Sequence, residues 1–330
     1  MTALAGTRRS PALVPQERAV GLRRVVVPTA VGRIVVRAGR RTDPPTGTSN
    51  PVAPILLHGA AGSWTTWTPL IAASDRTRSP MADLIVPDLP GWGESGELDR
   101  DATVRDLSSA VIEIARALGY TRWRIVGHSL GGFLALDIAA AAPAATTEVA
   151  LVSPSGAGVI DAVRRPMRGG RRLPAFAGML ATMRVLAALG SVGRGLVRTL
   201  GRAGAMRALS APLFARPRTI HSSVIAALAH EIRPTSFARA AALAGAYDTA
   251  EWRRVTCPVG SVRGTADVFA GEADAAAFAR LIPGFYEVVL DDAGHFAHVE
   301  RPAAVLAVIS ALAGLRRRDL PIAAGVRVAG

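Results

Sequence analysis

The stretch that most constrains this chain is residues 127–132, Gly-His-Ser-Leu-Gly-Gly, which stands between two apolar segments. The run 123–126 before it is typical of a buried strand, and the Ala- and Leu-rich pattern 133–142 after it is typical of a helix. A serine on so tight a turn needs small neighbours two positions away, and Gly127 and Gly131 meet that need. The pattern predicts a nucleophile elbow, with the helix N-terminus favouring a developing oxyanion at Ser129.

Short apolar segments alternate with helical patterns along most of the chain. The expected strands are 54–57, 83–86, 123–126, 149–152, 259–263 and 286–290, and the expected helices include 64–74, 103–118, 272–281 and 302–315. Two more apolar runs, 25–27 and 34–36, flank a turn and predict a β-hairpin. Strands that alternate with helices indicate an α/β fold with a mostly parallel sheet covered on both faces.

The alternation stops between residues 153 and 246, where apolar residues recur at spacings of three or four and nothing resembles a strand. We therefore expect one α/β core domain, formed by residues 23–152 and 247–317, with an all-helical lid inserted at 153–246. Residues 1–22 are rich in Pro and Arg and are expected to be mobile, and residues 318–330 form a C-terminal tail.

A serine hydroxyl becomes a nucleophile only beside a base that a third group orients. His295 follows the last expected strand, and Asp267 follows the strand 259–263, so both lie at the same sheet edge as Ser129. His298 is a second candidate for the base, and a turn cap is the structural alternative for Asp267. The chain order Ser129, Asp267, His295 is the order that this type of elbow requires.

A tetrahedral oxyanion needs two backbone N–H donors beside the serine. Leu130 supplies one because it opens the helix after the elbow. The second is expected from Ala60, which follows the strand 54–57 in the loop His58-Gly59-Ala60.

Together these motifs resemble those of the α/β-hydrolase superfamily, in its branch of small single-domain esterases, C–C bond hydrolases and cofactor-free haloperoxidase-like proteins. The matching segments are 58–59, 88–95, 127–132, 264–267 and 294–295. The resemblance implies an eight-stranded, mostly parallel sheet and a serine-ester intermediate, with no metal and no organic cofactor. It also implies that Asp88 is a scaffold residue.

The motifs predict a serine hydrolase that cleaves a carboxylic ester or thioester of an apolar acyl group through a Ser-His-Asp triad. Alternatives are a C–C bond (meta-cleavage-type) hydrolase, a cofactor-free haloperoxidase-like enzyme, or a non-catalytic ligand-binding or biosynthetic accessory protein. Ser129 argues against haloalkane dehalogenases and most epoxide hydrolases, which place Asp there. His128 and Phe296 stand where meta-cleavage hydrolases usually have Asn and Trp. Trp64 and Phe296 are candidates for the substrate pocket, and core packing is the alternative for Trp64 and its neighbour Trp67.

The positive charge is concentrated in the lid. The chain has a formal net charge of +14 without a single lysine, and residues 155–245 hold 14 arginines against two acids. Three interpretations stay open: a solvated outer face, a peripheral contact with anionic membrane, or a site for an anionic substrate. We exclude nucleic acid because no reading helix or aromatic stacking platform accompanies the charge.

The remaining features favour a cytoplasmic protein, with peripheral membrane contact as an addition. Cys257 is the one cysteine and excludes an internal disulfide. Arg8 and Arg9 are not followed by the apolar run of a signal peptide, and no apolar run approaches the roughly 20 residues of a membrane span. No pattern indicates an oligomeric state.

Overall fold

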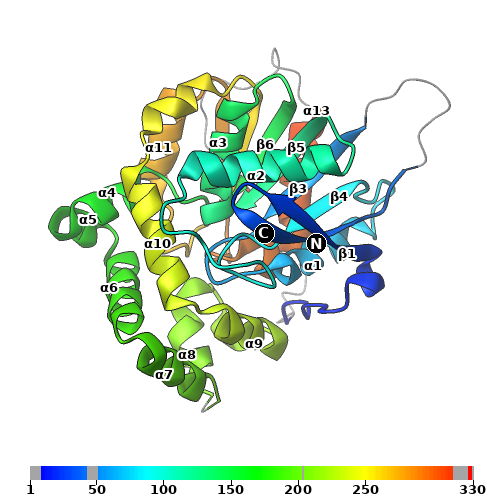
Figure 1. The fold of residues 1–330 in the computed structure, drawn as a ribbon. Helices are drawn as coiled ribbons and strands as arrows, with labels where there is room; N and C mark the ends of the chain where they lie inside the picture. The colour runs from blue at the N-terminus through cyan, green and yellow to red at the C-terminus, as the bar shows by residue number, and fades with distance from the viewer. Residues whose placement is uncertain (1–8, 43–50, 203, 315–325, 329–330) are drawn as a thin grey trace, which may run out of the picture.

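The computed structural model describes residues 9–42, 51–202, 204–314 and 326–328, and it contains one nine-stranded sheet with helices on both faces (Figure 1). The sheet order is β1-β2-β4-β3-β5-β6-β7-β8-β9. Only the β1–β2 and β2–β4 pairs are antiparallel. The strands are β1 (Leu22–Thr29), β2 (Gly32–Gly39), β3 (Val52–Leu57), β4 (Leu84–Pro87), β5 (Arg122–His128), β6 (Thr146–Val152), β7 (Val259–Gly264), β8 (Phe285–Leu290) and β9 (Val326–Val328). The predicted α/β-hydrolase sheet and its N-terminal hairpin are confirmed.

The ninth strand lies one beyond the eight that the resemblance implied. Val326–Val328 pairs in parallel with β8, with Val288 opposite Val326. Three residues are too short for a periodic signal, so only the neighbouring edge of β8 makes this segment a strand. The predicted C-terminal tail therefore contributes to the sheet edge through these three residues.

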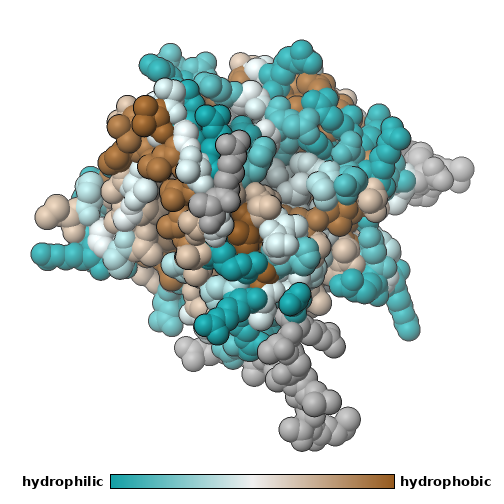
Figure 2. All heavy atoms as spheres, turned by 90° about the horizontal axis from the view of Figure 1, so that it is seen from below, coloured by the Kyte–Doolittle hydropathy of each residue, from teal (hydrophilic) through white to brown (hydrophobic). Residues whose placement is uncertain are grey.

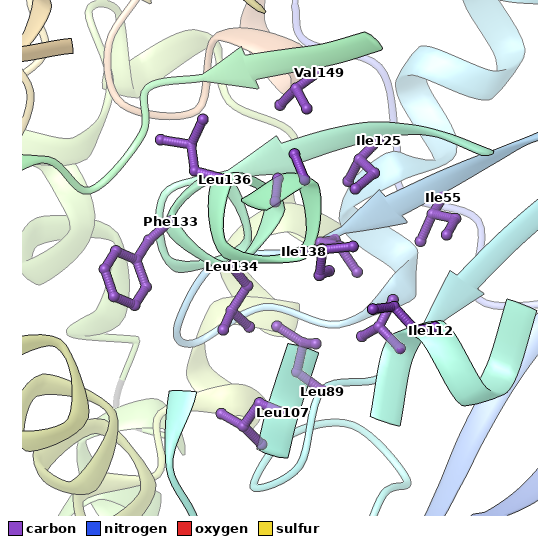
Figure 3. Packing of buried hydrophobic residues seen from close by; sticks show 14 of the residues in the cluster. Ile55, Leu89, Leu107, Ile112, Ile125, Phe133, Leu134, Leu136, Ile138 and Val149 are labelled. Atoms are coloured by element: carbon purple, nitrogen blue, oxygen red, sulfur yellow. The ribbon is translucent and has the colours of Figure 1, made fainter. Parts of the chain in front are cut away.

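Side chains of the central strands alternate between two buried layers. Ile55 and Leu57 of β3 belong to the cluster under α2 and α3, whereas Leu56 belongs to the cluster under α1 and α13. Because both layers are apolar, the strands read as continuous hydrophobic runs. Figure 3 shows the first layer, where Leu134 and Ile138 of α3 lie among side chains of α2 and the strands. The core helices are α1 (Thr68–Ser74), α2 (Val104–Ala117), α3 (Leu130–Ala141), α11 (Glu272–Leu281), α12 (Ala297–Glu300) and α13 (Pro302–Gly314), and the core 3-10 turns are η1 (Glu17–Val20), η2 (Trp64–Trp67) and η5 (Thr249–Arg254).

Local capping signals work as the sequence predicts. The Thr103 side chain accepts a hydrogen bond from the backbone N–H of Asp106, and the Asp106 carboxylate accepts one from the backbone N–H of Thr103. This capping box begins α2, and Gly119 follows the helix end with a φ of +90°.

Between β6 and β7 the described residues form helices and their connections but no strand, and this segment makes an arm along one side of the core (Figure 1). Pro166, Pro174 and Pro234 each stand in the first turn of a helix, where proline costs no hydrogen bond but limits how far the preceding helix extends. The lid elements are α4 (Ala157–Arg164), α5 (Pro166–Arg172), α6 (Pro174–Ala188), α7 (Gly190–Arg202), α8 (Met206–Ser210), η3 (Ala211–Leu213), η4 (Pro217–Thr219), α9 (Ser222–Glu231) and α10 (Pro234–Ala246).

Polar contacts tie the far end of the lid to the core. The Glu231 carboxylate accepts a hydrogen bond from the backbone N–H of Gly93 at 2.9 Å. The Arg233 guanidinium donates to the carbonyl oxygens of Gly93 at 2.6 Å and Gly91 at 3.3 Å. These charged hydrogen bonds hold the α9–α10 connection against the loop that follows β4.

Residues 9–22 differ from the loose segment that their composition predicted. The backbone N–H of Ser10 donates to the carbonyl of Thr219, and that of Leu13 donates to the Ser223 hydroxyl. Leu13 is buried with apolar residues of α9. This part of the N-terminal segment therefore packs along the lid because a buried leucine and its backbone hydrogen bonds hold it there. The other part of that expectation, residues 1–8, lies outside the described residues.

Candidate active site

Ser129 lies at the turn between β5 and α3 in the conformation that the elbow requires. Its φ is +51° and its ψ is −116°, a backbone conformation that is uncommon for a residue with a side chain. A methyl group added at Gly127 would lie 2.3 Å from the carbonyl oxygen of Gly131, and one added at Gly131 would lie 2.1 Å from that of Leu57. The glycines are thus required by close backbone approach, as the sequence pattern predicted.

The loops that carry the other two predicted residues cross directly beside each other. The backbone N–H of Ala266 donates to the carbonyl of Ala293 at 3.0 Å. A methyl group at Gly264 would lie 1.8 Å from that same oxygen, so only glycine allows the crossing. The parallel register of β7 and β8, in which Gly264 lies opposite Leu290, brings both loops to one edge of the sheet.

Asp267 and His295 form a hydrogen-bonded pair. The ring Nδ1 of His295 lies 3.0 Å from Oδ1 and 3.2 Å from Oδ2 of Asp267. Oδ1 also accepts the backbone N–H of Phe269 at 2.8 Å. Burial alone would raise the pKa of Asp267, but His295 and these hydrogen bonds outweigh it and lower that pKa below its ordinary value. The carboxylate therefore stays ionised and holds the proton of His295 on Nδ1, which leaves Nε2 as the basic nitrogen.

Ser155 is a residue of the site that the sequence analysis did not identify. Its Oγ lies 3.4 Å from the Oγ of Ser129, and it lines the same cavity as Ser129 and His295. Among the described residues this is the hydrogen bond that the Ser129 hydroxyl makes, and it makes none to His295. The position of Ser155 directly after β6, the strand beside the elbow strand, was the available signal.

The predicted oxyanion donors flank Ser129. Leu130 is the first residue of α3, where the backbone N–H has no intrahelical acceptor. Ala60 lies in the loop after β3, and both residues line the cavity that contains Ser129. A methyl group at Gly59 would lie 2.9 Å from Cβ of Ser129, so this loop is in contact with the elbow. The two residues therefore lie beside Ser129, and their backbone N–H groups remain the candidate donors to the oxygen of a carbonyl that Ser129 attacks.

His298, the second candidate for the base, does not belong to this arrangement. It is fully buried, its ring lies 4.6 Å from that of Trp67, and both of its nitrogens lack a hydrogen-bond partner among the described residues. Burial, together with the neighbouring His295, lowers the pKa of His298 to about 3. His128 lies between the two: its Nε2 donates to the carbonyl oxygen of His295 at 2.9 Å, and burial lowers its pKa as well. The rings of His128 and His298 are therefore neutral and pack against the loop that carries His295.

His58 and Asp88 hold the loops around the elbow. The Nδ1–H of His58 donates to the carbonyl of Gly59 at 2.8 Å, and its Nε2 accepts the backbone N–H of Leu89 at 2.9 Å. Asp88 is buried and accepts hydrogen bonds from the Arg37 guanidinium and the backbone N–H of Trp64. Asp88 therefore occupies the scaffold position that the resemblance implied.

The cavity at Ser129 has a volume of about 90 Å³ and is almost entirely apolar. Besides Ser129, Ser155 and His295, its walls are Ala60, Ala61, Leu130, Phe133, Val159, Phe176, Met179, Leu213, Leu228, Phe237, Ala240, Ala241, Ala244, Phe269 and Phe296. Phe296 lines it as predicted, but Trp64 does not. Trp64 is buried because its backbone N–H is tied to Asp88 and its ring packs against the Arg37 guanidinium at 5.0 Å. Core packing is the correct assignment for this tryptophan.

Two further properties concern the described residues as a set. They contain no group of three or more His, Cys, Asp or Glu side chains arranged to hold a metal ion. None of their helices is long and apolar enough to cross a bilayer.

Three kinds of relative resemble the chain. Curated proteins align with 31–40% of the length of this chain. The chain is 31% identical over 107 residues to the dihydrolipoyllysine-residue acetyltransferase component of the acetoin cleaving system of Pseudomonas putida. This alignment covers 32% of this chain and 27% of that protein. It is 30% identical over 132 residues to a 2-hydroxy-6-oxononadienedioate/2-hydroxy-6-oxononatrienedioate hydrolase of Burkholderia vietnamiensis, 40% of this chain and 46% of the relative. The chain thus spans less than half the length of these relatives.

A thermophilic esterase from Thermogutta terrifontis shares the fold, with a TM-score of 0.60, 22% identity, and coverage of 91% of this chain and 100% of the esterase. The family model described as "Alpha/beta hydrolase family" matches residues 55–308, which include the elbow, the Asp267 loop and the His295 loop. The expected enzyme class, a hydrolase, is confirmed by this match. The chain belongs to the alpha/beta hydrolase family.

Proposed function

We propose that the protein is a serine hydrolase that cleaves carboxylic esters or thioesters of apolar acyl groups. The observation that supports the proposal is that Ser129, His295 of the Asp267–His295 pair, Ala60 and Leu130 line one apolar cavity. The described side chains around Ser129 and His295 are mostly aliphatic and aromatic, and such walls favour an apolar acyl group over a charged one.

The mechanism follows from which atoms hold protons. Nε2 of His295 takes the Ser129 proton as Oγ bonds to the substrate carbonyl carbon, and the N–H groups of Ala60 and Leu130 stabilise the negative oxygen. His295 then gives the proton to the departing oxygen or sulfur as that bond breaks. In the second half, His295 takes a proton from water as the water oxygen attacks the acyl carbon. The bond between that carbon and Oγ of Ser129 then breaks, Oγ regains the proton from His295, and the carboxylic acid leaves. Asp267 stabilises the charged imidazolium in both halves.

A fluorescent fluorophosphonate tests whether Ser129 is an activated nucleophile. We expect the wild type to be labelled and to hydrolyse a short p-nitrophenyl ester, and Ser129→Ala to lose both while remaining folded by circular dichroism. Ser155→Ala is the matched control, since it removes a hydroxyl from the same cavity and should still be labelled. Labelling or ester turnover that persists in Ser129→Ala would refute the assignment.

C–C bond hydrolysis is the second candidate, because three curated relatives are named as hydrolases of 2-hydroxy-6-oxo acids. Such a substrate carries at least one carboxylate, yet no arginine lines the cavity at Ser129. We therefore rank it below ester cleavage. Parallel assays of a 2-hydroxy-6-oxo dienoate and a short ester distinguish them: faster Ser129-dependent turnover of the dienoate would reverse the ranking.

A further inference from the structure

The lid exposes apolar side chains that the core does not. The described residues include six exposed large hydrophobic residues, and all of them lie in the lid: Met167, Val185, Leu189, Val192, Leu196 and Leu209. Val185 is 60% exposed and Leu189 49% at the end of α6, and Val192 is 68% exposed at the start of α7. We call these three residues and Leu196 the lid tip. A soluble surface rarely gathers such side chains without something to cover them.

Close packing of α6 on α7 fixes the positions of the lid-tip residues relative to one another. A methyl group added at Gly193 would lie 2.0 Å from the carbonyl oxygen of Leu186, so this glycine lets the two helices touch through their backbones. Gly190 makes the turn between them with a φ of +54°. Val197 is buried on the inner side of α7, while Leu196 beside it is exposed.

Unpaired positive charge accompanies the lid tip. Arg184, Arg194 and Arg198 are exposed, and no carboxylate of the described residues lies within ion-pair distance of any of them. The sequence has no acidic residue between Asp161 and Glu231. Other lid arginines are engaged, as when Arg164 donates to the carbonyl of Gly245 and Arg207 to that of Ile220. Three exposed guanidinium groups without a carboxylate partner among the described residues therefore lie on the same two helices, α6 and α7, as the lid tip.

A second cavity lies behind this surface. Its volume is about 390 Å³, within the range of roughly 300–1,000 Å³ that is usual for ligand pockets. Met183, Leu186, Val197 and Leu200 of α6 and α7 line it, with few polar groups. Leu209 both lines the cavity and is 59% exposed, so the cavity reaches the surface.

The second cavity adjoins the catalytic one. Both are lined by Ala61, Met179, Leu213, Leu228, Phe237 and Phe269. Only apolar side chains therefore stand between the exposed second cavity and the cavity at Ser129, and a long alkyl chain is the shape that a path past them would accommodate.

Charge decides which occupant suits the lid tip. A second copy of this chain would bring the same arginines together, with no acidic residue in this stretch to pair them. An anionic bilayer fits both the exposed apolar side chains and the arginines of this surface. Its acyl tails receive the apolar side chains, and its phosphate groups pair with the guanidinium groups. Figure 2 views the molecule from the side on which α7 lies in Figure 1, and brown hydrophobic residues gather there beside teal ones.

We propose that the lid tip docks on anionic membrane and that the second cavity receives the acyl chain of a membrane-dissolved ester on its way to Ser129. The chain-binding half of this proposal rests on the proposed function, whereas the docking half does not. The substrate class that follows is a long-chain acyl ester delivered from a lipid surface.

Docking is tested with Ser129→Ala protein, so that hydrolysis cannot alter the lipid. We expect co-sedimentation with vesicles of phosphatidylcholine containing roughly one quarter phosphatidylglycerol to exceed that with pure phosphatidylcholine at least about tenfold, and to weaken as salt rises. Adding Val192→Ser with Leu196→Ser, or Arg194→Glu with Arg198→Glu, should reduce binding by about tenfold or more.

Arg76→Glu with Arg78→Glu is the matched control, because both arginines are exposed on the core and the change in charge is the same. It should leave binding within about twofold. Equal binding to both vesicle types, no binding to either, or equal loss in this control would overturn the docking. So would a dimer in sedimentation velocity that Val192→Ser with Leu196→Ser dissolves, if vesicles do not bind.

The chain route is tested with Met183→Trp, which fills the second cavity, against Met167→Trp, the same substitution at a position 84% exposed. Over a series of p-nitrophenyl esters, Met183→Trp should lower kcat/KM for long acyl chains about tenfold more than it lowers kcat/KM for the acetate. Equal loss at all lengths, or no loss, would overturn the route. A wild type without Ser129-dependent acetate hydrolysis would instead refute the proposed function.

Discussion

The core and the lid of this protein use their small and charged residues in opposite ways. In the core, glycines such as Gly131 and Gly264 stand where backbone meets backbone, and the buried charged groups Asp88 and Asp267 each have defined partners. In the lid, helices expose apolar side chains, and several arginines have no ion-pair partner among the described residues. The comparison shows that close backbone packing fixes the residues around Ser129, whereas the lid leaves apolar and cationic side chains at its surface.

The largest expected effect lies in the core. Asp267→Asn should lower kcat for ester hydrolysis about 10⁴-fold, because the neutral amide neither stabilises the imidazolium nor fixes the tautomer of His295. Asp274→Asn is the control, as that buried carboxylate accepts the backbone N–H of Gly158 and takes no part in the triad. The rates are measured on variants whose folds match by circular dichroism. Similar losses in both variants would mean that packing, not charge, accounts for the effect.

The next effect is on stability and depends on pH. The pKa of His298 is lowered to about 3 by burial, against an unfolded value of 6.5. As the pH falls, the unfolded chain is protonated at this histidine before the folded protein is. The free energy of unfolding therefore decreases progressively from about pH 6.5 down to about pH 3. The wild type should lose about 2 kcal/mol of unfolding free energy at pH 5 through this group alone.

His298→Phe should remove that share of the acid sensitivity, because phenylalanine keeps the contact with Trp67 and cannot be protonated. Urea unfolding of both proteins at pH 8 and pH 5 measures the difference. Equal losses between the two pH values in wild type and variant would show that His298 is not held neutral by the core.

A smaller effect is expected at the contact between the two regions. The Glu300 carboxylate accepts the backbone N–H of Ala215 in the lid at 2.9 Å and that of Gly294, beside His295, at 2.6 Å. Glu300→Ala should lower kcat about tenfold with little change in KM for a short ester, since His295 would be less well positioned. Glu300→Gln, which keeps one acceptor, should lose less. A change in KM alone would assign Glu300 to the lid rather than to the catalytic loop.

The smallest effects separate the lid arginines from one another. Arg233→Ser should cost about 1 kcal/mol of unfolding free energy, because its guanidinium donates to the carbonyls of Gly91 and Gly93. Arg171→Ser should stay within about 0.5 kcal/mol, since it is exposed and has no ion-pair partner in the described part of the chain. Urea titrations at pH 8 compare the two, and equal costs would contradict the division into anchoring and free arginines.

Much of the fold was predictable because its signals are local. The elbow, the α2 capping box and the alternating buried strands each lie within about a dozen consecutive residues. The β9 strand was missed because its three residues acquire strand geometry only from the edge of β8. For Trp64 the sequence allowed either the substrate pocket or the core, and only its contacts with Asp88 and Arg37 assign it to the core.

The candidate catalytic residues were predictable for the same reason, and so was the helical character of the lid, but the contacts of its side chains were not. Ser129, Asp267 and His295 each follow a strand, and parallel strands carry the residues after them to one edge of the sheet. Ser155 also follows a strand, but nothing in its neighbours marks a lone hydroxyl as part of the site. In the lid, the excess of arginine was plain in the sequence, yet which arginines donate to carbonyls and which stay free depends on how α4 to α10 pack.

By itself, the sequence determined the α/β class, the elbow and the chain order of the candidate catalytic residues, because glycine spacing and apolar periodicity act over short distances. Only the tertiary structure decided that residues 9–22 pack along the lid, that the six exposed hydrophobic residues gather there, and that two apolar cavities adjoin behind Ser129. The physical reason is that exposure and enclosure are properties of surfaces formed by segments distant in sequence. Such surfaces exist only once the helices of the lid have packed against one another and against the core.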